Sequence, residues 1–143
     1  MGMMRAGVPA LGLAAACLLS GAPVLAEAPS VSVELNKLEP TGSNCRAYLV
    51  VNNESSTGLK AFKLDLVLFQ NDGVIGRRFA VDLAPVRPNK RSVKLFDIEG
   101  TSCEGIGSLL INDVMECEAE TGQVDDCLAA VSVSSLSQVK LTK

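Results

Sequence analysis

The stretch FKLDLVLFQNDGVIGRRFAVDL, residues 62–83, decides the fold of this chain. Large apolar residues fill its even-numbered positions from 62 to 68 and its odd-numbered positions from 79 to 83, and such alternation predicts half-buried strands. An Asp-Gly pair at 72–73 separates the two runs, which is a strong hairpin signal. The stretch therefore predicts two antiparallel strands, residues 62–69 and 75–83, joined by a tight turn.

The same period of two recurs on both sides of this hairpin. Further alternating runs occupy residues 31–35, 46–51, 93–96, 108–112 and 129–133. Glycine, asparagine, serine and proline separate the runs, as expected of turns. Seven short strands with turns this regularly spaced predict an all-β domain, a single antiparallel immunoglobulin-like β-sandwich. The acidic segment 114–128 fits either a loop or a short helix.

The first 26 residues have the parts of a cleavable secretory signal. A single basic residue, Arg5, precedes an apolar run from 8 to 25, and small or β-branched residues stand at Val24 and Ala26. We therefore expect cleavage after Ala26 and a mature domain of residues 27–143. This domain should lie in the periplasm, with no membrane insertion after the signal is removed.

Two other readings of this segment stay open. A membrane anchor needs about 20 consecutive apolar residues, and glycine and proline, which weaken helices, interrupt this run. Lipidation at Cys17 is the second alternative, because residues 14–17 form a loose lipobox. The apolar run continues past Cys17, which favours a cleavable signal over a lipid anchor.

The hairpin region resembles small bacterial envelope domains with an immunoglobulin-like fold. The resemblance rests on residues 62–76, Leu83-Ala84-Pro85, Pro88 and Val93, which match a strand, a DG turn, a second strand, an LxP segment and a final strand. The mature chain is also similar to small exported proteins of Gram-negative bacteria that are often labelled as Tat-signal proteins. A Tat signal has paired arginines, whereas Arg5 stands alone. We therefore expect export by the general secretory route. The resemblance itself implies a fold and a compartment.

The mature chain contains four cysteines, Cys45, Cys103, Cys117 and Cys127, which allow three disulfide pairings. If consecutive strands run up and down, Cys45 and Cys103 lie at one end of the domain and Cys117 and Cys127 at the other. Bridged cysteines need Cα atoms within about 7 Å. We therefore expect the pairs Cys45–Cys103 and Cys117–Cys127. No C-x-x-C motif is present, which argues against a redox or zinc site.

The composition removes the usual catalytic and cofactor-binding groups. The sequence contains no histidine, so Ser-His-Asp and Cys-His arrangements are impossible. The carboxylates of residues 116–126 cluster in one polar stretch, as solvated loops do, and their spacing matches no calcium-loop motif. A net charge of −3 argues against non-specific binding to nucleic acid. We expect no cofactor and no metal.

The charges are segregated along the chain. Six basic residues lie between 77 and 94: Arg77, Arg78, Arg87, Lys90, Arg91 and Lys94. Nine acidic residues and no basic one lie between 97 and 126. These are either two solvated faces that attract each other, or a bipolar surface that steers a charged partner.

Apolar side chains also fall on the outward parity of the central strands, at Val67, Phe69 and Phe96. Together with Arg78 and Lys94 they form the predicted partner-binding surface, an apolar centre with a charged rim. A loop that covers the two phenylalanines would instead make them part of the core. The sequence thus favours a non-catalytic module that binds a protein partner in the cell envelope, as an accessory subunit of an envelope or respiratory complex. An exported inhibitor of a lysozyme or protease and an enzyme of unfamiliar type are the alternatives.

Overall fold

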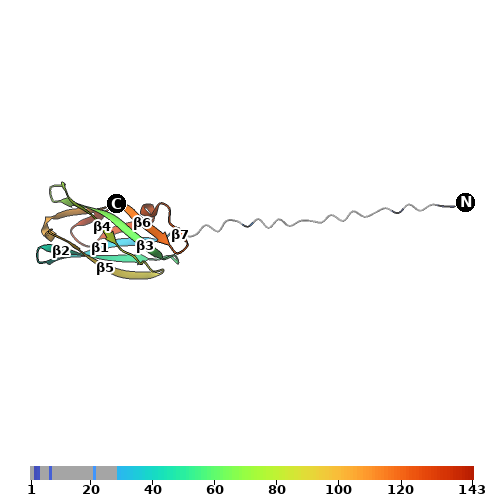
Figure 1. Cartoon of the computed structure of the whole chain (residues 1–143), viewed down its shortest axis with the longest axis horizontal. Helices are drawn as coiled ribbons and strands as arrows, with labels where there is room; N and C mark the ends of the chain where they lie inside the picture. The colour runs from blue at the N-terminus through green and yellow to red at the C-terminus, as the bar shows by residue number, and fades with distance from the viewer. Residues whose placement is uncertain (1, 4–6, 8–20, 22–28) are drawn as a thin grey trace.

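A computed structural model describes residues 2–3, 7, 21 and 29–143 (Figure 1). The predicted cleavage site after Ala26 and the candidate lipidation site Cys17 lie outside the described residues. Within the described part of the chain, no helix is long and apolar enough to cross a membrane.

Strands make up most of residues 29–143, and only two short helical turns interrupt them. In chain order the elements are β1 (Val31–Thr41), β2 (Asn44–Asn53), β3 (Leu59–Gln70), β4 (Ile75–Asp82), β5 (Lys90–Ile98), η1 (Cys103–Gly105), β6 (Ile106–Ala119), β7 (Gly122–Gln123), α1 (Cys127–Ala130), β8 (Val131–Ser135) and β9 (Lys140–Thr142). The predicted hairpin is β3 and β4, with Gly73 at a φ of 83° in the turn, a conformation that favours glycine.

The strands form two sheets, which enclose one core. The first sheet has the order β5-β2-β1-β8, and the second has the order β4-β3-β6-β7 with β9 beside β6. The prediction of an all-β domain is confirmed, whereas the prediction of about seven antiparallel strands was wrong, because residues 29–143 form nine strands and two of the strand pairs are parallel. β8 lies parallel to β1 and β9 lies parallel to β6, so both sheets are mixed. Alternation in a sequence reports which side chains are buried and carries no information on the direction of the neighbouring strand.

The acidic segment 114–128 begins as the second half of a strand. β6 runs unbroken from Ile106 to Ala119, and register shifts against β3 leave Gly107, Asn112 and Met115 without a partner opposite. Each such bulge resets the side-chain parity, so the period of two is lost from the sequence although the strand continues. The remainder of the segment forms β7 and enters α1.

The core fills the space between the inner faces of the two sheets. Val33, Leu35 and Leu49 contribute from the first sheet, and Phe62 and Leu64 from the second, all at 2% exposure or less. Burial of this apolar surface is the main driving force for folding.

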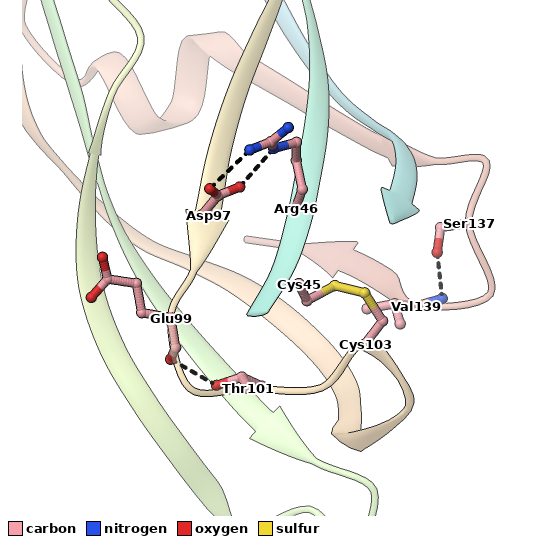
Figure 2. The surroundings of a disulfide bond; sticks show 8 residues. All are labelled: Cys45, Arg46, Asp97, Glu99, Thr101, Cys103, Ser137 and Val139. Carbon is pink, nitrogen blue, oxygen red and sulfur yellow. Dashed lines mark hydrogen bonds and ion pairs between the residues drawn. A yellow bond between two sulfur atoms is a disulfide. The ribbon is translucent and has the colours of Figure 1, made fainter. Parts of the chain in front are cut away.

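Two disulfides join the cysteine pairs expected from the strand directions. Cys45, where β2 begins, bonds to Cys103 in η1, with a Cα–Cα distance of 4.9 Å (Figure 2). Cys117 of β6 bonds to Cys127 at the start of α1, with a Cα–Cα distance of 6.4 Å.

Candidate functional site

The five residues predicted to bind a partner lie on two different sheets. Val67 and Arg78 are cross-strand neighbours on β3 and β4, and Phe69 follows on β3. Lys94 and Phe96 belong to β5, the edge strand of the other sheet. The structure therefore does not bring all five residues together on one face.

The register of β5 against β2 decides which β5 side chains face outward. Lys94 lies opposite Leu49 and Phe96 lies opposite Ala47, and both β2 residues are buried in the core. Because opposed residues of an antiparallel pair point to the same face, Lys94 and Phe96 have the core-facing parity. The prediction that these two residues point outward was wrong. Phe96 packs instead against Phe79 of β4, with 5.8 Å between the ring centroids.

The predicted residues on the second sheet are also largely engaged within the domain. Val67 is buried and Phe69 is half-buried. Arg78 donates two hydrogen bonds of 2.8 Å to the carboxylate of Asp65, which also accepts a 2.7 Å bond from the Asn112 amide. The hydrogen bonds from Arg78, and then from Asn112, lower the pKa of Asp65 below its ordinary value. This network orders the outer face of the second sheet.

A different apolar surface is exposed on the first sheet. Val93 is 57% exposed and Leu95 is 52% exposed. They lie opposite Val50 and Tyr48 of β2, so the four side chains share the outer face. We call these four residues, Tyr48, Val50, Val93 and Leu95, the outer-face patch.

Charged side chains with fixed positions border the outer-face patch. Arg46 donates bonds of 2.7 and 3.1 Å to the two carboxylate oxygens of Asp97, and this contact lowers the pKa of Asp97 (Figure 2). The Tyr48 hydroxyl donates a 2.5 Å bond to Glu39, and Lys37 lies 5.1 Å from the Tyr48 ring centroid. The bond from Tyr48, and then the contact with Lys37, lower the pKa of Glu39. The rim is therefore ionised and ordered near neutral pH.

The patch lies at an open edge of its sheet. All nine residues of β5 pair with β2 without a register shift, and in the described part of the chain no strand pairs with the other side of β5. β4, the edge strand of the second sheet, differs because a register shift leaves Gly76 unpartnered. A long, regular edge strand with apolar side chains presents unpaired backbone groups to any strand that approaches.

The basic and acidic stretches do not neutralise each other. Arg78 forms an ion pair with Asp65, and no other basic residue between 77 and 94 has an ion-pair partner within residues 29–143. In the acidic stretch, Asp97, Glu116 and Glu118 pair with Arg46, Lys63 and Lys60, which lie outside the basic stretch. Within residues 29–143, therefore, no close ion pair joins the basic stretch to the acidic stretch.

A hollow of about 540 Å³ lies between the β3–β4 turn and the segment that follows β5. Asp72 is the carboxylate among its lining residues and Arg77 is the base, while the rest are small or neutral. Arg77 donates to the Glu99 carbonyl oxygen. The described residues include no group of three or more acidic, histidine or cysteine side chains placed to hold a metal.

No protein-family model matches the chain, and no curated protein is significantly similar in sequence. The fold is similar to a solved structure of IrmA from Escherichia coli. The two chains are 11% identical, with a TM-score of 0.53 over 73% of this chain and 91% of that chain. At this identity the similarity concerns the fold alone.

Proposed function

We propose that the mature chain is a non-catalytic protein-binding module of the cell envelope, built as an immunoglobulin-like sandwich. The observation that carries the proposal is the exposure of Val93 and Leu95 on an edge strand. The two disulfides support an oxidising compartment, where such bonds persist. The similarity to IrmA supports a two-layer β fold of this kind.

The outer-face patch has the composition of a specific interface. Its centre is apolar, and the ordered ion pair of Arg46 with Asp97 lies at its rim. Interfaces commonly combine such a centre with a polar rim, in which the centre supplies affinity and the rim charges set the association rate. Val93 and Leu95 are exposed to solvent beside Val50 and do not contribute to the domain's own core. Exposed apolar side chains that gather in one place are typical of a binding surface.

Site-specific photo-crosslinking in cells that produce the protein tests this proposal. A photoreactive residue at position 95 should form a discrete crosslink to one envelope protein. The matched control is position 132, because Ser132 is exposed on the same sheet but lies on β8, at its opposite edge. Equal crosslinking from both positions, or none from position 95, would contradict the proposal.

The β3–β4 turn favours inhibition of an enzyme as a second candidate function. Val74 and Ile75 protrude at this turn, with 58% and 61% exposure. The turn is held by bonds from the Val74 amide to Asp72 (3.0 Å) and from the Gly73 amide to the Gln70 carbonyl (2.9 Å). An ordered, protruding apolar tip suits insertion into an enzyme cleft.

A panel of lysozymes and proteases separates the two functions. If the chain is an inhibitor, the parent should inhibit at least one of them and Ile75→Lys should lose this inhibition. Leu95→Lys serves as the matched control, because it makes the same change on the outer-face patch. If Ile75→Lys inhibits as well as the parent, or if the parent inhibits no enzyme of the panel, the hairpin is not an inhibitory loop.

A further inference from the structure

We propose that the open edge of β5 binds an extended acidic segment of a partner protein by strand addition. The segment carries an acidic residue opposite Lys94, between apolar residues opposite Val93 and Leu95. This inference rests on the proposed function and specifies the chemistry of the partner.

The backbone of β5 is ready for an added strand. The strand pairs with β2 through all nine residues from Lys90 to Ile98, with no register shift and no proline. In an extended strand, alternate residues turn their N–H and C=O groups to opposite sides, so about half of these groups face the open edge. An added strand satisfies them and gains main-chain hydrogen bonds.

The side chains of β5 specify what the added strand carries. Lys90 and Lys94 have the core-facing parity, because they lie opposite the buried Asn53 and Leu49. Val93 and Leu95 have the outward parity. Since directly opposed residues meet across a strand pair, acidic residues fit opposite the lysines and apolar residues fit opposite the outward pair.

The basic residues of β5 have no ion-pair partner in the described part of the chain, and the acidic residue of β5, Asp97, is paired with Arg46 of β2. Five basic residues make no ion pair within residues 29–143: Arg77, Arg87, Lys90, Arg91 and Lys94. The Lys94 ammonium lies 3.5 Å from the carbonyl oxygens of Ala84 and Pro85, which is the limit of hydrogen-bond length. A carboxylate on the added strand can therefore form an ion pair with Lys94.

Lys94 also argues against a second copy of the chain as the occupant. Antiparallel pairing of two β5 strands that places Val93 against Leu95 puts Lys94 opposite its own counterpart. Two like charges directly opposed on neighbouring strands are destabilising, and inward-pointing charges are a known protection of sheet edges. The same register places Arg91 of each copy opposite Asp97 of the other, and Asp97 is already paired with Arg46. Lys94 thus opposes this self-pairing, whereas it attracts an acidic strand, and specificity is commonly built from such a difference.

The fold already contains one strand pair of this chemistry. Residues 115–120 of β6 and its following turn alternate apolar and acidic side chains, and β6 lies beside β3. Lys63 forms a 2.8 Å ion pair with Glu116, and Lys60 lies 3.9 Å from Glu118. An acidic strand beside β5 would repeat the arrangement at the free edge.

Binding of synthetic peptides to the mature protein tests the inference. The probe is acetyl-Thr-Val-Glu-Val-Thr-Glu-Glu-amide, which in the antiparallel orientation places Glu opposite Lys94, Arg91 and Lys90. One comparison peptide has lysine in place of each glutamate, and another has the same side chains with N-methylated backbone amides. Isothermal titration calorimetry should show binding of the acidic probe and at least tenfold weaker binding of the other two, because each lacks the charge or the backbone complement.

A charge reversal on β5 provides the decisive comparison. Lys94→Glu should weaken binding of the acidic probe by roughly tenfold and strengthen binding of the lysine peptide. Lys140→Glu, an equal charge change on the exposed face of β9, should leave both affinities unchanged. Circular dichroism confirms that each variant is folded.

Three outcomes would overturn the inference. They are equal binding of the acidic and lysine peptides, equal binding of the N-methylated peptide, or a β5-dependent dimer that the acidic probe does not disrupt. If position 95 still crosslinks to a partner while the acidic probe does not bind, strand addition fails and the proposed function stands. If the probe binds while position 95 crosslinks to nothing, the edge is competent and the proposed function fails.

Discussion

Leu49 of β2 lies directly opposite Lys94 of β5, so the lysine occupies the core-facing side of an edge strand. The two neighbours of Lys94 in the chain, Val93 and Leu95, are turned to solvent. From Val93 to Leu95, β5 therefore presents a charge inward and apolar side chains outward, the reverse of a segment that serves only its own core. Further along the strand, Phe96 and Ile98 face the core in the ordinary way. The inverted segment 93–95 is the basis of both the proposed function and the proposed partner chemistry.

The mature protein should begin at Glu27. The apolar run from 8 to 25 is followed by Ala26, and Val24 and Ala26 are the β-branched and small residues expected before a signal-peptidase cleavage site. Intact mass of the exported protein measures the cleavage site. A retained N-terminus, or a mass increase from lipid at Cys17, would show that the segment is an anchor.

The two disulfides should contribute unequally to stability. The bond between Cys45 and Cys103 spans 58 residues and that between Cys117 and Cys127 spans 10. On the chain-entropy model, their removal costs about 4 and about 3 kcal/mol, respectively. Urea unfolding of the two double-alanine variants measures the difference. A larger loss for the short loop would contradict the entropic account.

The Asp65 network should stabilise the domain in a pH-dependent way. Bonds from Arg78 and Asn112 lower the pKa of Asp65 below its ordinary value of 3.8. The stabilisation is therefore complete above that value and is lost as the pH falls through the lower folded-state pKa. Asp65→Asn should reduce the free energy of unfolding at pH 7, and the gap to the parent should shrink in strong acid.

Urea unfolding at pH 7 and pH 2.5 measures this gap. Asp125→Asn is the control, because Asp125 is exposed and lies in no ion pair of the described residues. A gap of equal size at both pH values would mean that the carboxylate charge is not what stabilises the network.

Gly107 should not tolerate a side chain. A Cβ at this bulge of β6 would lie 2.4 Å from the carbonyl oxygen of Gln70, a backbone atom with little freedom to move. Gly107→Ala should cost about 1–3 kcal/mol, as overpacking does. Gly105→Ala is the control, because its Cβ would meet only the Ser102 hydroxyl, at 3.3 Å. Thermal unfolding compares the two, and equal midpoints would contradict the packing argument.

The hairpin and the disulfide pairs could be predicted from the sequence, whereas the candidate binding surface could not. The alternation around Asp72-Gly73 reports β3 and β4 directly, and the cysteine pairs follow from strand directions alone. In the run from Val93 to Phe96, large apolar residues occupy both parities. Only the register with β2 decides which parity faces the core, and register is a tertiary property.

The strands of the C-terminal half were also hard to predict from the sequence, for a different reason. Three unpartnered residues in β6 break its alternation, so the strand reads as ending before Ala119. β8 and β9 are short, with five and three residues, and pair in parallel with strands far away in sequence. Nothing local in such segments encodes their partner or their direction.

Hydrogen exchange of the β5 amides with and without the acidic probe tests the central claim most directly. Exchange slows where an amide gains a hydrogen bond. We predict new protection at alternate residues between Lys90 and Phe96, none at β8, and a protection curve for Lys94→Glu that needs about tenfold more probe. Protection confined to the β3–β4 turn, or unchanged exchange along β5 at a saturating probe concentration, would contradict the account.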